Sequence, residues 1–106
     1  MKPVLILTNS DSSEEAERIA DRILNGKLAA AVQVIGPMSS RYRWQGRIHR
    51  KLEWMVLIKT CNSREDEIQS IIRELHSYEL PSILKIPIDG GDSRYLQWIL
   101  SQSTGG

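Results

Sequence analysis

The stretch SRYRWQGRIHRKLEWMVLIKT, from Ser40 to Thr60, decides the fold. Glycine accepts a positive φ at no steric cost, so Gln45-Gly46 predicts a tight two-residue turn between antiparallel strands. We expect the second of these strands to run from Arg47 to about Thr60. A turn of this length also fixes the residues that face each other across the strands, namely Trp44 with Arg47, Tyr42 with His49, and Arg43 with Ile48.

The sequence before this hairpin predicts two strands around one helix. Val4–Thr8 is apolar throughout its first four residues, which is typical of a central strand covered on both faces. The segment DSSEEAERIADRILNGK follows, with Ser12 and Glu15 spaced as a capping box ahead of an apolar stripe of helical period. We then expect a strand over Leu28–Ile35, with a break or bulge at Gly36-Pro37 before the hairpin.

The sequence after the hairpin predicts a second helix and an edge strand. NSREDEIQSIIRELHSY carries acidic residues in its first turn and an apolar stripe, so we expect Asn62 or Ser63 to cap a helix that ends near His76. The segment LPSILKIPID, residues 80–89, is expected to form a strand. Its prolines lack the N–H that a ladder needs, which favours the edge of the sheet.

The C-terminal part predicts one more amphipathic helix. It should start at Asp92 or Ser93, bury one apolar face and leave residues 101–106 as a frayed tail; the buried residues are expected to be Leu96, Ile99 and Leu100. The element order is then β-α-β-β-α-β plus a helix. This order predicts an α+β protein, a ferredoxin-like sandwich with a C-terminal helix, in one domain that spans residues 1–106.

The second strand of the hairpin is apolar on both faces. Trp54, Val56 and Ile58 point to one side, and Met55 and Leu57 point to the other. Helices of such a sandwich cover only one face, so a monomer would expose an apolar patch. We therefore expect an oligomer that packs its open sheet faces together, with Trp54, Val56 and Ile58 in the interface. The alternative, a long loop over the strand, finds no spare segment of sufficient length.

Composition limits the classes of partner. Fourteen basic and thirteen acidic residues give a formal charge of +1, so no overall field attracts the chain to a polyanion or a membrane. Cys61 is the only cysteine, which excludes an intrachain disulfide and suits a reducing compartment. The apolar start is too short for a signal sequence or a membrane span, so we expect a cytoplasmic protein without membrane partners.

Arginines interleaved with aromatic residues raise the question of nucleic-acid binding. An RNA-recognition motif has the same element order and stacks bases on aromatic side chains of its central strands. This chain has no phenylalanine, and the first strand offers only Leu5 and Leu7 at the corresponding positions. We therefore expect no nucleic-acid partner and interpret the hairpin tip as a contact with a neighbouring subunit.

The motifs KLAAAVQV, SSRYRWQGRI, EWMVLIKT, HSYELPSI and YLQWI occur in the order and spacing of one known family. In this combination the chain resembles the CutA family, the divalent-cation tolerance proteins. The resemblance implies a ferredoxin-like subunit in a compact homotrimer, a part in the response to metal ions such as copper, and no enzymatic reaction. It also implies an assembly like that of the P-II signalling proteins, which bind small effectors between subunits; a P-II-like sensor is the alternative function.

The resemblance also singles out site residues. Five residues of this chain resemble the lining of the family's intersubunit cleft, namely Tyr42, Trp44, Glu53, Lys59 and Tyr78. In this chain they would form either a ligand site or an interface of paired charges. Glu53 and Lys59 lie about 20 Å apart along one strand, so their partners must come from another strand or subunit.

The resemblance also implies possible metal binding. We expect no required cofactor, and the expected ion is copper or another divalent metal. His76 and Glu79 carry ligand atoms for Cu²⁺ or Zn²⁺, but such a site needs three or four ligands. The others would come from Glu53, His49 or another subunit; alternatively His76 is a helix-end residue. The chain departs from the family pattern at Ala31, where a cysteine is common, and at Ser77, where a proline is common. Cys61 is expected to be a packing residue.

Overall fold

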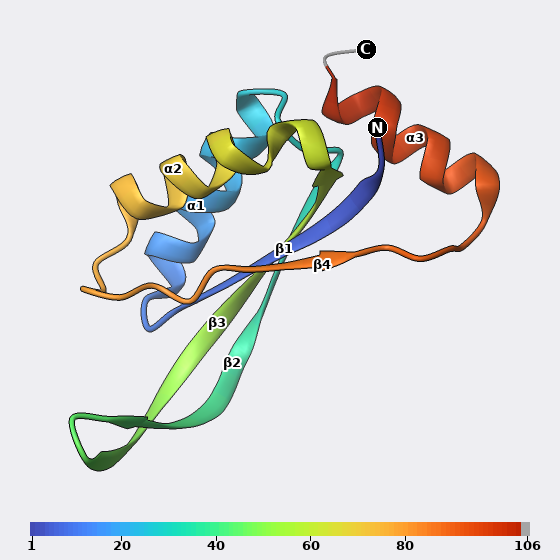
Figure 1. The fold of residues 1–106 in the computed structure, drawn as a ribbon. Helices are drawn as coiled ribbons and strands as arrows, with labels where there is room; N and C mark the ends of the chain where they lie inside the picture. Colours follow the sequence, from blue (N-terminus) through green and yellow to red (C-terminus); the bar gives the residue numbers. More distant parts are fainter. Residues whose placement is uncertain (105–106) are drawn as a thin grey trace.

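The computed structural model describes residues 1–104 and contains one four-stranded antiparallel sheet with helices against it (Figure 1). The strand order is β2-β3-β1-β4, which confirms the ferredoxin-like arrangement. In chain order the elements are β1 (Pro3–Ser10), α1 (Ser13–Asn25), β2 (Ala31–Trp44), β3 (Arg47–Cys61), a 3₁₀ turn (Asn62–Arg64), α2 (Glu65–Leu75), β4 (Leu84–Pro87) and α3 (Ser93–Ser103).

The helices α1 and α2 lie together on one face of the sheet (Figure 1). Along β1 every second residue is buried, because successive strand side chains point to opposite faces and only one face is covered. Ser12 caps α1 as predicted, accepting the N–H of Glu15 at 3.2 Å. The core consists of Val4, Ile6, Ala16, Ile19, Ala20, Ile23, Leu28, Ala29, Val56, Ile58, Ile68 and Ile72.

The predicted interface residues of β3 lie on the wrong face for that role. Val56 and Ile58 are completely buried beneath the helices of their own chain, so they cannot contact another subunit. Trp54 packs against the same core, and a Cβ at Gly36 would lie 2.5 Å from its Cδ1 atom. The prediction that β3 is apolar on both faces is confirmed, but the open face carries the other set.

The open face of the sheet bears a row of apolar side chains that no helix covers. Leu57 of β3 pairs with Leu7 of β1, which in turn pairs with Leu84 of β4. Next to this row, Met55 pairs with Ile35, a side chain that is 48% exposed. In β1 and β3 these residues alternate with buried ones, so their position on the uncovered face follows from strand geometry.

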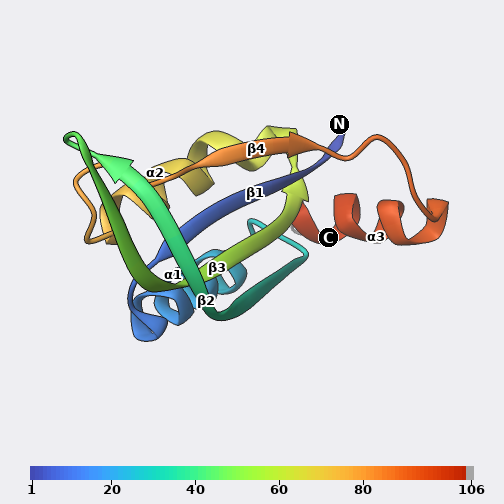
Figure 2. The same ribbon diagram turned by 90° about the horizontal axis from the view of Figure 1, so that it is seen from below.

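The hairpin has the predicted turn and register. Gln45 and Gly46 both have positive φ, 50° and 76°, and Trp44 pairs with Arg47 across the turn. The register shifts between Ile35 and Met38, which confirms the irregularity predicted at Gly36-Pro37. Figure 1 shows the hairpin extending beyond the helices, and Figure 2 shows that its twist brings the tip toward the segment between α2 and β4.

The start of α2 differs from the prediction. Neither Asn62 nor Ser63 caps α2, because the Asn62 side chain accepts the N–H of Lys2 and the Ser63 hydroxyl contacts Cys61. A 3₁₀ turn precedes the helix instead. The helix ends at Leu75 with His76 as its C-cap, which confirms the predicted end near His76.

The bounds of β4 and α3 also differ from the predicted ones. β4 covers only four residues within the predicted 80–89, at the predicted edge of the sheet. Asp92 caps α3 by accepting the N–H of Tyr95. Residues 101–103, predicted to fray, are helical because Ser103 is completely buried and its carbonyl accepts Arg64 Nε at 2.9 Å. Residues 105–106 of the predicted tail lie outside the described residues.

Candidate functional site

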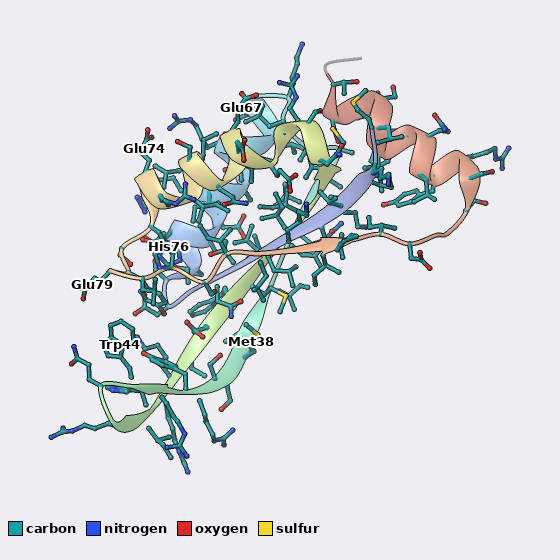
Figure 3. The ribbon with its side chains drawn as sticks, viewed as in Figure 1. Met38, Trp44, Glu67, Glu74, His76 and Glu79 are labelled. Carbon is teal, nitrogen blue, oxygen red and sulfur yellow. The ribbon has the colours of Figure 1, made fainter. Side chains whose placement is uncertain are left out.

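A cleft of about 630 Å³ lies between the hairpin and the segment that follows α2. Trp44 of the hairpin faces the part of the chain that carries His76 and Glu79 (Figure 3). The hairpin supplies one wall of the cleft, and residues 78–82 supply the other. The lining residues are Asn9, Ser39, Ser40, Arg41, Tyr42, Trp44, Lys51, Glu53, Tyr78, Glu79, Leu80 and Ser82.

A short hydrogen bond joins the two walls of the cleft. The Tyr78 hydroxyl donates to Glu53 Oε2 at 2.6 Å, and Glu53 is only 5% exposed. Burial, and then the hydrogen bond to the Glu53 carboxylate, raise the pKa of Tyr78 far above its ordinary value, because a phenolate would be desolvated beside another anion. Tyr78 is therefore a neutral donor that satisfies a buried carboxylate.

Lys51 contacts two aromatic residues of the cleft and Asp11, which lies outside its lining. Its Nζ lies 4.8 Å from the ring centre of Tyr78, 5.6 Å from that of Tyr42 and 3.4 Å from Asp11 Oδ2. The hydrogen bond with Tyr42, and then Asp11, raise the pKa of Lys51 against the opposing effect of burial. Lys51 was not predicted as a cleft residue from the sequence. Its position could have been predicted from strand parity, because Lys51 and Glu53 are two residues apart and therefore lie on the same face of β3.

A buried carboxylate below the cleft fixes the segment that carries Tyr78. Glu15 accepts Ser10 Oγ at 2.7 Å, and it accepts the Ser77 N–H at 2.9 Å. Glu15 is 6% exposed, so each of these bonds lies in a protected environment. In the sequence, Glu15 was selected only as part of a capping box. Its burial could have been predicted, because Glu15 precedes Ile19 by four residues and so lies on the same, core-facing side of α1.

His76 belongs to the same buried cluster. Its Nε2 donates to the Asn9 carbonyl at 2.6 Å, and its Nδ1 accepts the Tyr78 N–H at 3.1 Å. Nδ1 also lies 3.5 Å from Glu15 Oε2, and the side chain is completely buried. His76 therefore positions Tyr78 from below the cleft.

These contacts exclude His76 as the predicted metal ligand in this conformation. Both of its nitrogens are engaged, and Glu79 is exposed at the rim of the cleft. Among residues 1–104 there is no group of three His, Cys, Asp or Glu side chains that could hold a metal ion. The remaining predicted ligands do not complete a set, because Glu53 is paired with Tyr78 and His49 stacks on Tyr42 at 5.4 Å.

Two further sets of residues are of the types found in reactive sites, but their contacts do not support such a role. Ser10, Glu15 and His76 lie together, but the histidine contacts backbone groups and the carboxylate rather than Ser10, so the serine lacks the histidine base of a catalytic triad. Cys61 is completely buried, with Sγ 3.1 Å from Ser63 Oγ and 3.9 Å from Met1 Sδ. Its contacts are those of a packing residue.

Lys59 is the predicted cleft residue that the fold places elsewhere. Its Nζ donates to the Tyr95 hydroxyl at 2.9 Å and lies 5.3 Å from the centre of that ring. This contact ties β3 to α3, away from the cleft lining. Of the five predicted cleft residues, the structure thus brings together Tyr42, Trp44, Glu53 and Tyr78.

Known proteins are similar to the chain in sequence and in fold. The chain matches the family model described as CutA1 divalent ion tolerance protein over residues 4–102. It is 39% identical over 94 residues to the divalent-cation tolerance protein CutA of Archaeoglobus fulgidus, covering 89% of this chain and 91% of that protein. It is 34% identical over 105 residues to the protein of the same name from Thermus thermophilus, covering 99% and 100% of the two chains.

Solved structures of proteins from the same two organisms superpose closely on the chain. The divalent cation tolerance protein from Thermus thermophilus aligns with a TM-score of 0.91 at 31% identity, covering 95% of this chain and 98% of that one. The structure described as the periplasmic divalent cation tolerance protein CutA from Archaeoglobus fulgidus aligns with a TM-score of 0.90 at 37% identity, with the same coverage of 95% and 98%.

Proposed function

The chain belongs to the CutA family of divalent-cation tolerance proteins, and we propose that it acts in the response to divalent metal ions as a homotrimer that binds ligands and catalyses no reaction. The observation that carries this proposal is the open apolar face of the sheet. Leu7, Leu57 and Leu84 form a continuous row there, and Ile86 and Ile35 are exposed beside it. A second copy is the occupant that the family resemblance implies.

The hydrophobic free energy of burying these side chains favours self-association through this face. Full burial of a leucine or isoleucine side chain contributes about 1.5–3 kcal/mol, so a handful of them suffices to hold subunits together. The face is also the one where β1, β3 and β4 present apolar residues to no helix. Packing the faces of several copies would cover β1 on both sides, as its apolar sequence predicts.

Sedimentation equilibrium tests the assembly. We expect the wild type to sediment at about three times the chain mass of 12.1 kDa. Leu57→Asp places a charge in the centre of the apolar row and should give a folded monomer, as judged by circular dichroism. Leu52→Asp, at a residue that is 57% exposed on the opposite parity of β3, is the matched control and should leave the mass unchanged. A wild-type monomer at micromolar concentration would refute the proposal.

A divalent metal does not fit the described residues of a single chain. Copper and zinc need three or four nitrogen, oxygen or sulfur ligands, and no such group occurs within residues 1–104. We therefore propose that any direct copper site takes ligands from more than one subunit. Isothermal titration with copper should then show binding to the trimer and none to the Leu57→Asp monomer; equal binding by both would refute a shared site.

The second candidate is a P-II-like sensor that binds a small effector in the cleft. The cleft favours it, because aromatic side chains, Lys51 and a buried carboxylate converge on a volume of about 630 Å³. A thermal-shift screen of nucleotides and organic anions, without metal, tests it through the stabilisation that any bound ligand produces. An effector of this cleft should lose its shift in Trp44→Ala and keep it in Trp98→Ala, a substitution of a 42% exposed tryptophan on α3.

The cellular compartment of the protein is a separate question from its assembly. No helix within residues 1–104 has the length and apolar character to cross a membrane. Residence in the cytoplasm stays a prediction from the sequence, since one related structure is described as that of a periplasmic protein.

A further inference from the structure

The arginines of the hairpin are not used by the hydrogen bonds of the cleft or by the open face. Residues 39–52 contain Arg41, Arg43, Arg47, Arg50 and Lys51 and no acidic residue, a charge of +5. The whole chain carries fourteen cations and thirteen anions, so the rest of it has nine cations, thirteen anions and a charge of −4. The positive charge is therefore concentrated in a segment that extends beyond the helices (Figure 1).

Three of these arginines share one face of the hairpin. Arg41 lies directly opposite Arg50, and Arg43 lies opposite Ile48. Residues opposite each other in an antiparallel pair have Cβ atoms about 4.5–5.5 Å apart, and like charges in such a pair are destabilising. Residues two apart along a strand point the same way, so Arg41, Arg43 and Arg50 converge around Ile48.

Nothing in the described chain neutralises this group. All three arginines are exposed, and none of them forms an ion pair within residues 1–104. A hollow of about 250 Å³ lies beside two of them, lined by Arg41, Tyr42, Arg43 and Ile48, and Arg50 is the cross-strand neighbour of Arg41. A repulsive cross-strand pair is thus retained beside an open hollow, where a bound anion would both relieve the repulsion and gain charge-assisted hydrogen bonds.

We propose that Arg41, Arg43 and Arg50 form a binding site for a small oxyanion with two or more negative charges, of the polyphosphate type. Guanidinium groups bind phosphate oxygens in a bidentate manner, and four of the five cations in this segment are arginine rather than lysine. An anion with several charges can bridge the opposed pair, whereas a monovalent anion neutralises one member only.

The geometry favours a small anion over larger partners. Tyr42 is the only aromatic residue of the described chain that lines the hollow, and Trp44 lies on the other parity of β2, so the arginine face lacks the succession of aromatic side chains on which single-stranded nucleic acid stacks. Strand parity also places Arg50 with Val56 and Ile58 rather than with Met55 and Leu57 of the open face. The arginine face is therefore not the face proposed for self-association.

Isothermal titration with inorganic tripolyphosphate at low ionic strength tests the site. We expect saturable binding that weakens about tenfold or more in the double variant R41Q/R50Q. The matched control is R18Q/R94Q, which removes the same charge at exposed positions on α1 and α3 and should stay within about twofold of the wild type. Equal weakening in both double variants would show a general charge effect and overturn the proposal.

The unliganded variants supply a measurement that does not depend on affinity. Relief of the Arg41–Arg50 repulsion should leave the melting temperature of R41Q/R50Q unchanged or raised, whereas tripolyphosphate should raise that of the wild type. A lowered melting temperature or a changed sedimentation mass without ligand would show that the arginines pair with another copy, against the proposal. Tighter arginine-dependent binding of single-stranded RNA or of anionic lipid vesicles than of tripolyphosphate would also overturn it.

Discussion

The two halves of the sheet are stabilised in different ways. Where β3 runs beneath the helices, Val56, Ile58 and Thr60 are completely buried. Where β3 continues into the hairpin, Ile48 is 63% exposed and Leu52 is 57% exposed. The same two strands are thus held by burial at one end. At the other end they are held by turn geometry, cross-strand pairs and the contacts across the cleft.

This difference separates stability from recognition. The buried half contributes most of the hydrophobic free energy, since stabilisation scales with the apolar area removed from water. The hairpin contributes little of it and instead presents aromatic and charged groups toward the cleft and arginines on its other face. Substitutions in the two halves should therefore affect different measurements.

The largest contrast is expected between two isoleucines of β3. Ile58→Ala should lower the free energy of unfolding by about 2–5 kcal/mol, because it removes buried atoms and leaves a cavity in the core. Ile48→Ala, the same substitution in the hairpin, should change it by about 0.5 kcal/mol or less. Urea denaturation at one fixed protein concentration measures both. Similar losses for the two variants would contradict the division of the strand.

A smaller effect is expected at Glu15, which binds the segment that carries Tyr78. Glu15→Gln replaces a buried acceptor of Ser10 and Ser77 and should cost about 1–3 kcal/mol of unfolding free energy. Glu14→Gln, an exposed neighbour on α1, is the control and should have little effect. Hydrogen exchange of the Tyr78 amide, which donates to His76, should quicken only in Glu15→Gln. Unchanged exchange would show that Glu15 does not position the segment.

The smallest effect is expected at the contact across the cleft. Tyr78→Phe should cost about 1 kcal/mol at neutral pH, because Glu53 loses its donor. Folding raises the pKa of Tyr78 above its ordinary value of about 10, so its contribution is complete below pH 10 and declines as the pH rises further. Between about pH 9 and 11, the variant should therefore lose less stability than the wild type.

Phenolate absorbance gives an independent check of the same group. The difference between the wild-type and Tyr78→Phe titrations should isolate a step well above the ordinary tyrosine pKa of about 10. A step at the ordinary value would show that Tyr78 is neither buried nor paired with Glu53.

Most of the fold could be predicted because its signals are local. Ser12 before Glu15 predicted the cap of α1, and Gln45-Gly46 predicted the turn and hence the register of the hairpin. Where the signals compete, prediction failed. Asn62 and Ser63 have capping side chains, but Lys2, far away in the sequence, and Cys61, close by, contact those atoms instead.

The candidate site could be predicted only in part. Tyr42, Trp44, Glu53 and Tyr78 were selected and do line one cleft, while Lys59 was selected and does not. The roles of Glu15 and Lys51 were missed, although spacing on the helix and parity on the strand placed them on the relevant faces.

The sequence by itself determined the order of helices and strands, the turn at Gln45-Gly46 and the apolar character of both faces of β3. Each of these depends on neighbours within a few residues, through capping, backbone φ and side-chain period. Only the tertiary structure decided which face of β3 became the core. It also decided that His76 positions Tyr78 rather than offering a free nitrogen. Those outcomes depend on contacts between residues far apart in the chain, such as Asn9 with His76 and Glu53 with Tyr78.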